Sequence, residues 1–167
     1  MTRLYLLRHA KSSWDEPGLS DRDRPLAPRG ERAAGRMAEH LRTAGVRPDV
    51  VLCSPAVRAR QTLEIVQAAL SEPQVLVEDP LYATDADGLL ERLRSLPVGT
   101  AAAMVVAHNP TLQDLALDLA SSGAGLDRLR EKLPTGALVT LVFEGPWSGL
   151  GPGGAVLEDL VAPRGLR

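Results

Sequence analysis

Cysteine, histidine and excess charge are all scarce in this sequence of 167 residues. The single cysteine, Cys53, excludes an intramolecular disulfide, and together with three scattered histidines it gives no recognisable zinc-binding spacing. The formal net charge of −2 provides no general attraction to nucleic acid or to an acidic membrane surface. We therefore expect no metal, no nucleic acid and no membrane as partners, so any bound anion must be held by a local cluster of residues.

Long apolar runs are absent as well. The first apolar run, residues 4–7, is too short and wrongly flanked for a signal peptide, and no later stretch is long enough to span a membrane. We expect a cytoplasmic protein. A chain of this length matches one ordinary domain and can bury a core without disulfides or metal, so the sequence predicts a single domain over residues 1–167.

Short β-like runs alternate with helical patterns, which is typical of an α/β fold with a mainly parallel sheet. Continuous apolar runs predict strands buried on both faces, and apolar residues spaced i, i+3, i+4 and i+7 predict amphipathic helices. The expected strands are residues 4–7, 50–52, 75–77, 102–107, 138–143 and 155–160. The expected helices are residues 28–44, 55–70, 89–96 and 110–119, and the expected loops include residues 121–125 and 145–154.

Two of these helices share a start signal. Ser54 and Asn109 are each followed by proline, which is the pattern of an N-cap residue and a proline at the first helical position. This interpretation places Arg58 in the first turn of its helix. Gly45 is expected to end the helix over residues 28–44.

Three predicted strand ends bear residues suited to phosphoryl chemistry. Arg8 and His9 follow the first strand, Arg58 follows the second, and His108 follows the strand over residues 102–107. Ligands of open α/β sheets bind at the carboxyl ends of the strands, and helices that begin there favour a bound anion. Two histidines and two arginines around one such pocket therefore indicate phosphoryl binding and transfer.

The same segments resemble a known family. Arg8-His9-Ala10, residues 54–62 (SPAVRARQT) and residues 108–110 (HNP) are similar to motifs of the histidine phosphatase (phosphoglycerate mutase-like) superfamily, and the similarity spans nearly the whole chain. Ala10 departs from the superfamily pattern, which has glycine there, and we interpret it as a small-residue variant that leaves the site intact. The segments that are also similar to the small SixA-type branch are residues 8–14, 24–30, 133–136 and 163–164.

This resemblance implies a three-layer α/β/α sandwich of the phosphoglycerate mutase-like kind. It also implies that His9 is the nucleophile that becomes a phosphohistidine, while Arg8, Arg58 and His108 bind and stabilise the phosphoryl oxygens. A neutral imidazole, which a nucleophile requires, is abundant near pH 7, and His108 would act best as a cation. Because these groups supply positive charge, the scheme needs no cofactor or metal, and we expect activity in the presence of a chelator.

Arg24 is a further candidate for substrate binding. The loop after His9 is expected to fold back over the site, and it offers few other fixed cations. The alternative is a surface arginine in a salt bridge, and the sequence favours neither.

Larger members of the superfamily use a carboxylate to protonate the leaving oxygen, and that pattern does not align with this sequence. The candidates are Glu78, Asp79, Asp85 and Asp87, although the last two also suit the start of a helix. A phosphohistidine leaves as an imidazole whose other nitrogen can already hold a proton, so it tolerates a missing acid. We therefore expect protein phosphohistidine as the substrate.

Two other functions remain open from the sequence. A phosphatase or mutase acting on small phosphate esters would need an acid that the motifs do not reveal. A non-catalytic phospho-binding module would keep the arginines, but intact His9 and His108 count against it. The expected partner is thus a phosphorylated protein or a small phosphorylated substrate, and the sequence does not specify an oligomeric state.

Overall fold

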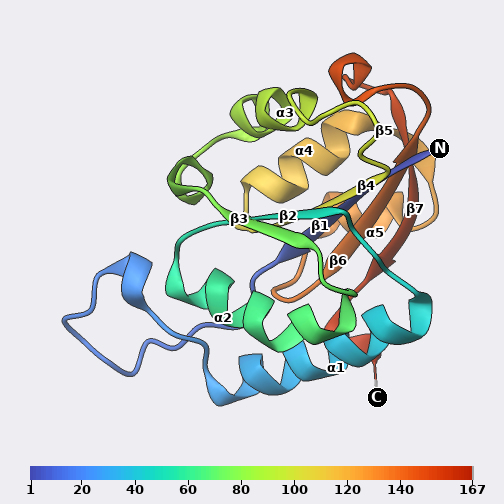
Figure 1. Cartoon of the computed structure of the whole chain (residues 1–167). Coiled ribbons are helices and arrows are strands. Elements are labelled where there is room, and N and C mark those ends of the chain that lie inside the picture. Colours follow the sequence, from blue (N-terminus) through green and yellow to red (C-terminus); the bar gives the residue numbers. More distant parts are fainter. Residues whose placement is uncertain (167) are drawn as a thin grey trace.

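The computed structural model describes residues 1–166, which form a seven-stranded sheet covered by helices (Figure 1). The strands lie in the order β3-β2-β4-β1-β6-β7-β5. The strands are β1 (Thr2–Arg8), β2 (Val50–Cys53), β3 (Gln74–Val77), β4 (Ala102–Ala107), β5 (Ala120–Gly123), β6 (Leu138–Phe143) and β7 (Ala155–Val161). The α-helices are α1 (Pro28–Ala44), α2 (Val57–Val66), α3 (Ala86–Arg94), α4 (Thr111–Leu119) and α5 (Leu126–Glu131).

The sheet is mainly parallel, which confirms the predicted fold class. β3, β2, β4 and β1 run parallel to one another, β6 is antiparallel to both β1 and β7, and β5 is parallel to β7. The order β2-β4-β1 brings together the carboxyl ends of three strands that are far apart in the sequence. None of the helices in residues 1–166 is both long and apolar enough to cross a membrane.

Three layers follow from how the strand residues alternate. Leu4 and Leu6 of β1 pack in one core with residues of α3, α4 and α5, whereas Tyr5 and Leu7 pack in a second core with residues of α1 and α2. Figure 1 accordingly shows α1 and α2 on one face of the sheet and α3 and α4 on the other. Because both faces are covered, β1 is a continuous apolar run rather than an alternating one.

α1 has the predicted bounds. Its buried residues include Ala34, Met37, Ala38 and Leu41, at the spacing that keeps one face of a helix against the sheet. Gly45 ends the helix as expected, in the left-handed conformation with φ of 69°, and its N–H donates to carbonyls of the last turn.

The start signals of α2 and α4 were misinterpreted. Ser54 does not cap α2, whose N-cap is Ala56, and α2 gives way to a short 3-10 helix after Val66. Pro110 rather than Asn109 holds the N-cap position of α4, although Asn109 Oδ1 accepts the Gln113 N–H of the first turn at 3.2 Å. Arg58 nevertheless lies in the first turn of α2. Ser54 is instead used as a side-chain partner, since its Oγ accepts from the Ala56 N–H at 3.2 Å.

The loop predicted for residues 121–125 is wrong. Residues there form β5, an edge strand paired in parallel with β7, and α5 follows it. Serine and glycine conceal this strand in the sequence, because its stability comes from pairing rather than from an apolar pattern. Gly123 is required there, since a Cβ would lie 2.1 Å from the Leu157 carbonyl oxygen.

Candidate active site

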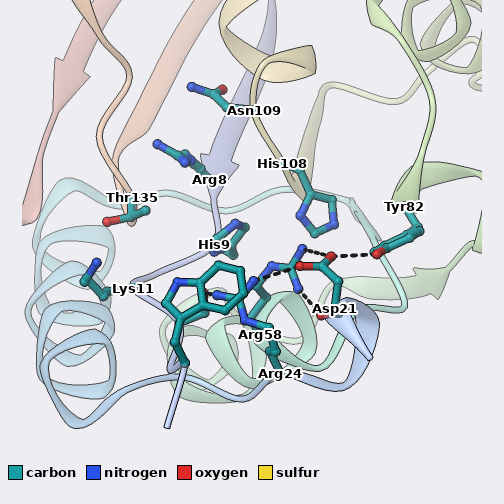
Figure 2. Close-up of a pocket in the computed structure, with 12 residues that line it drawn as sticks. Arg8, His9, Lys11, Asp21, Arg24, Arg58, Tyr82, His108, Asn109 and Thr135 are labelled. Atoms are coloured by element: carbon teal, nitrogen blue, oxygen red, sulfur yellow. Dashed lines mark hydrogen bonds and ion pairs between the residues drawn. The ribbon is translucent and has the colours of Figure 1, made fainter. Parts of the chain in front are cut away.

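A cavity of about 510 Å³ opens at the carboxyl ends of β1 and β4. His9 enters it directly after β1, Arg58 from the first turn of α2, and His108 directly after β4, so the structure brings the predicted residues together (Figure 2). The lining residues are Arg8, His9, Lys11, Ser12, Trp14, Asp21, Arg24, Arg58, Tyr82, His108, Asn109 and Thr135.

His9 is buried and held in one tautomer. Its Nδ1 lies 2.7 Å from the Ala10 carbonyl oxygen, which can only accept, so Nδ1 carries the proton and Nε2 keeps a free lone pair. The pKa of His9 is lowered to about 3, mainly by burial and also by nearby His108, Arg58 and Arg8, while the hydrogen bond to the Ala10 carbonyl opposes the shift. The imidazole is therefore neutral at pH 7, as a nitrogen nucleophile must be.

His108 lies beside His9, with 5.2 Å between the ring centroids. Its Nε2 is 2.7 Å from Ser54 Oγ, whereas its Nδ1 has no hydrogen-bond partner among the described residues. The pKa of His108 is lowered to about 4, mainly by burial and also by Arg58 and Arg8, while Asp21 opposes the shift. Beside the protein's own charges His108 is therefore neutral at pH 7, whereas the catalytic role expected from the sequence is best filled by the cation.

Arg58 and Arg8 are placed to bind an anion in different ways. Arg58 is buried, and Asp21 holds it through the backbone oxygen at 2.5 Å and through Oδ2 at 2.9 Å. Arg8 donates from Nη1 to the Leu133 carbonyl at 2.8 Å, and its Nε has no partner among residues 1–166. Both guanidinium groups thus keep N–H donors for a ligand, since each has five.

Arg24 also lines the cavity, but it is neither exposed nor free. Its Nε donates to the Ser13 carbonyl at 3.1 Å, its Nη1 to Asp21 at 2.8 Å, and its Nη2 to the Ser12 hydroxyl. Its guanidinium carbon lies 3.2 Å from the centroid of the Trp14 ring. Arg24 therefore organises the loop over residues 12–24, and every one of its nitrogens already has a partner.

Asp21 and Tyr82 belong to the site but were missed in the sequence. Asp21 lies in a one-turn 3-10 helix over residues 21–23 and accepts from Arg24, Arg58 and the Tyr82 hydroxyl, the last at 2.6 Å (Figure 2). The Tyr82 hydrogen bond and the two arginines hold the pKa of Asp21 well below its usual range. The only sequence signal was the i, i+3 spacing of Asp21 and Arg24, because the link to Arg58 spans 37 positions.

The four acids considered from the sequence lie elsewhere. Glu78 makes a two-point ion pair with an arginine of α3, at 2.8 and 2.9 Å, and Asp79 pairs with an exposed arginine at 3.1 Å. Asp85 is the N-cap of α3, where it accepts a backbone N–H at 2.8 Å, and Asp87 lies in the first turn of that helix. Helix capping by Asp85 was therefore the better of its two interpretations.

Residues 4–82 match the family model described as histidine phosphatase superfamily (branch 1). Over 162 residues the chain is 38% identical to an uncharacterised protein of Mycobacterium tuberculosis, covering 95% of this chain and 100% of that protein. A solved structure from Nakamurella multipartitia, assigned as the phosphohistidine phosphatase SixA, matches with a TM-score of 0.85 and 34% identity over 97% of this chain and 96% of that one. A protein histidine phosphatase SixA in complex with tungstate matches with a TM-score of 0.79 and 26% identity over 99% and 100%.

Proposed function

The chain belongs to the histidine phosphatase superfamily, within its SixA-type branch, and we propose that it removes the phosphoryl group from phosphohistidine in a protein substrate. The observation that carries this proposal is the state of His9, which is neutral and unprotonated at Nε2. His9 lines one cavity together with Arg8, Arg58 and His108. The relatives assigned as phosphohistidine phosphatases support the substrate class.

In the first step, His9 Nε2 attacks phosphorus. An N–P bond forms on His9 while the bond between phosphorus and the ring nitrogen of the substrate breaks. The substrate imidazole leaves as a neutral ring when its other nitrogen already holds a proton, so no proton donor is needed. Phosphorylated His9 then has its proton on Nδ1, and the Ala10 carbonyl stabilises the positive charge.

In the second step, water attacks the phosphoryl group on His9. The N–P bond breaks, both hydrogens of the water leave with the phosphate, and His9 returns to its neutral form. In each step Arg8 and Arg58 donate N–H groups to the equatorial oxygens, which is the main source of catalysis in phosphoryl transfer. His108 lines the same cavity, where a protonated ring adds positive charge beside the phosphoryl oxygens.

The one acidic side chain in the described cavity favours an imidazole leaving group over an alkoxide. Asp21 is the one carboxylate among the described lining residues, and its depressed pKa keeps it ionised at neutral pH. An ionised carboxylate cannot protonate a leaving oxygen. A phosphoramidate such as phosphohistidine does not require that proton, so it suits the site better than a sugar phosphate or phosphoglycerate.

The proposal is tested by phosphate release from a phosphohistidine protein, beside p-nitrophenyl phosphate and 3-phosphoglycerate, with a chelator present. We expect rapid release from the phosphohistidine protein, no release by His9→Ala, and slow turnover of the two esters. Faster turnover of the esters would show that the substrate class is wrong. Binding of phosphohistidine without release would show a phospho-binding module instead.

A further inference from the structure

An exposed tryptophan stands at the catalytic cavity. Trp14 has 74% of its surface exposed, and it is the one large, exposed apolar residue of residues 1–166 that also lines the cavity. The other lining residues are nearly all charged or polar, and they suffice to bind a phosphoryl group. Trp14 is therefore not explained by phosphate binding.

The tryptophan is also held in place. One face of its ring stacks on the Arg24 guanidinium at 3.2 Å, and Arg24 is fixed by three hydrogen bonds to Ser12, Ser13 and Asp21. The backbone is anchored on the same side, where the Ser13 N–H donates to the Pro25 carbonyl at 2.8 Å. A cation–π contact of this kind orders an aromatic ring without covering both of its faces.

A rigid, exposed aromatic ring is well suited to contact a macromolecule. Such residues lose little conformational entropy on binding and dominate the affinity of many protein interfaces. The ring of Trp14 is mostly open to solvent rather than enclosed by the cavity, so it would meet the part of a substrate that extends beyond the phosphoryl group. Leu19, on the same loop, is 39% exposed and adds a second apolar side chain to the segment.

We propose that Trp14 is a specificity-determining residue that binds the polypeptide flanking the phosphohistidine of a protein substrate. This inference rests on the proposed function, because it requires that the substrate be a protein. Trp14 is then the residue by which the enzyme discriminates between a protein that contains phosphohistidine and a small molecule with the same phosphoryl group. The phosphoryl group itself stays with Arg8, Arg58 and His108.

The test compares a phosphohistidine protein with free phosphohistidine as substrates of the full chain. Trp14→Ala should raise KM for the protein at least about thirtyfold, the scale of an interface hot spot, and leave its kcat and the kcat/KM for free phosphohistidine within about twofold. Trp14→Phe should restore most of the affinity, because a phenyl ring can stack on Arg24 and present the other face. Val98→Ala is the matched control, since Val98 is 89% exposed and precedes β4 at the opposite end of the sheet.

Three results would overturn the inference. An equal loss of kcat/KM for both substrates in Trp14→Ala would mean that Trp14 only shields Arg24. Direct measurement of tungstate binding by Trp14→Ala would then show weakened binding as well. An unchanged KM for the protein would mean that Trp14 contacts nothing in the substrate. Failure of the wild-type enzyme to act on either phosphohistidine substrate, with activity on esters, would instead overturn the proposed function and this inference with it.

Discussion

At the level of single residues, the orientation of Arg58 depends on Asp21. Asp21 holds two nitrogens of Arg58 and one of Arg24, so it fixes both cations and offsets the repulsion between them. We expect Asp21→Asn to lower kcat about tenfold, less than the ~10²–10³ lost when a preorganised donor is removed outright. KM should change less than kcat, because a flexible Arg58 still attracts the substrate.

Steady-state kinetics of Asp21→Asn beside Asp23→Asn provide the measurement. Asp23 lies in the same short helix, but its carboxylate accepts from the Ser20 hydroxyl at 3.0 Å, so its loss should leave kcat unchanged. Asp21→Glu should recover part of the rate, since it keeps the charge. A wild-type kcat in Asp21→Asn would contradict a positioning role for Asp21.

The charge of His108 is a second property that belongs to one residue. The pKa of about 4 makes His108 neutral beside the protein's own charges, mainly because it is buried and also because it lies near Arg58. A bound dianion should raise that pKa, since an opposite charge favours the protonated imidazole. We therefore expect tungstate binding at pH 7 to take up a fraction of a proton.

Calorimetric titration in two buffers of different ionisation enthalpy measures this uptake. The observed heat should differ between the buffers for the wild-type protein and not for His108→Asn, which cannot titrate at that position. Arg8 and Arg58 remain in that variant, so binding itself should survive at lower affinity. Equal heats in both buffers for the wild type would show that His108 stays neutral throughout.

At the level of elements, the sequence predicted the helices and strands that have a periodic or continuous apolar pattern. The prediction failed for features that depend on contacts with residues distant in the sequence. α1, β4 and β6 have the predicted bounds, because their apolar patterns are long and face a continuous core. The caps of α2 and α4 were misplaced because the two helices begin later than the dipeptides suggested, with N-caps at Ala56 and Pro110. Asn109 Oδ1 still accepts an N–H of the first turn of α4, from one position before the N-cap. β5 was missed because it is defined by its pairing with β7.

The helix α1 offers a paired test of how an element supports the site. A Cβ on Gly30 would lie 2.1 Å from the Lys11 carbonyl oxygen, two residues after His9, whereas one on Gly35 would meet nothing within 4 Å. Gly30→Ala should therefore destabilise the protein by about 1–3 kcal/mol and lower its activity, because the backbone at Lys11 must move. Gly35→Ala should stabilise it by about 0.5–1 kcal/mol, as expected for glycine replaced within a helix.

Thermal melting and phosphatase assays of the two variants decide this prediction. Gly35→Ala should raise the Tm by roughly 1–4 °C and keep full activity, since about 1 kcal/mol corresponds to a few degrees in a chain of this size. If Gly30→Ala had the same stability and activity as Gly35→Ala, the close approach of α1 to the loop after His9 would not be needed for either property.

At the level of the whole molecule, the topology assembles the site. β1, β2 and β4 are adjacent although they are separated in the sequence, and His9, Arg58 and His108 follow or lie close to their carboxyl ends. Strand-end motifs could therefore be predicted to meet from the α/β pattern alone. The ion pairs of Asp21 could not, because loop residues lack periodicity and their contacts depend on the final path of the loop.

Assembly of the site also carries a cost that appears as pH-dependent stability. The folded pKa values of His9 and His108, about 3 and about 4, lie below the ~6.5 of an unfolded histidine, so the unfolded chain binds more protons at intermediate pH. The stability associated with these residues is complete above about pH 6.5 and is lost as pH falls towards their folded pKa values, with a slope of at most about 2.7 kcal/mol per pH unit for two protons. The depressed pKa of Asp21 acts in the same direction, but only once pH falls into and below the range in which a free carboxyl titrates.

Urea unfolding between pH 7.5 and pH 5 isolates the two histidines, because Asp21 stays ionised throughout that range. We expect the unfolding free energy of the wild-type protein to fall steadily below about pH 6.5. The double variant His9→Gln/His108→Gln should show a much flatter dependence whatever its absolute stability, since neither glutamine takes up a proton. Parallel curves for the two proteins would mean that the buried imidazoles are as easily protonated in the folded state as in the unfolded one, and that the neutral nucleophile is not a product of the fold.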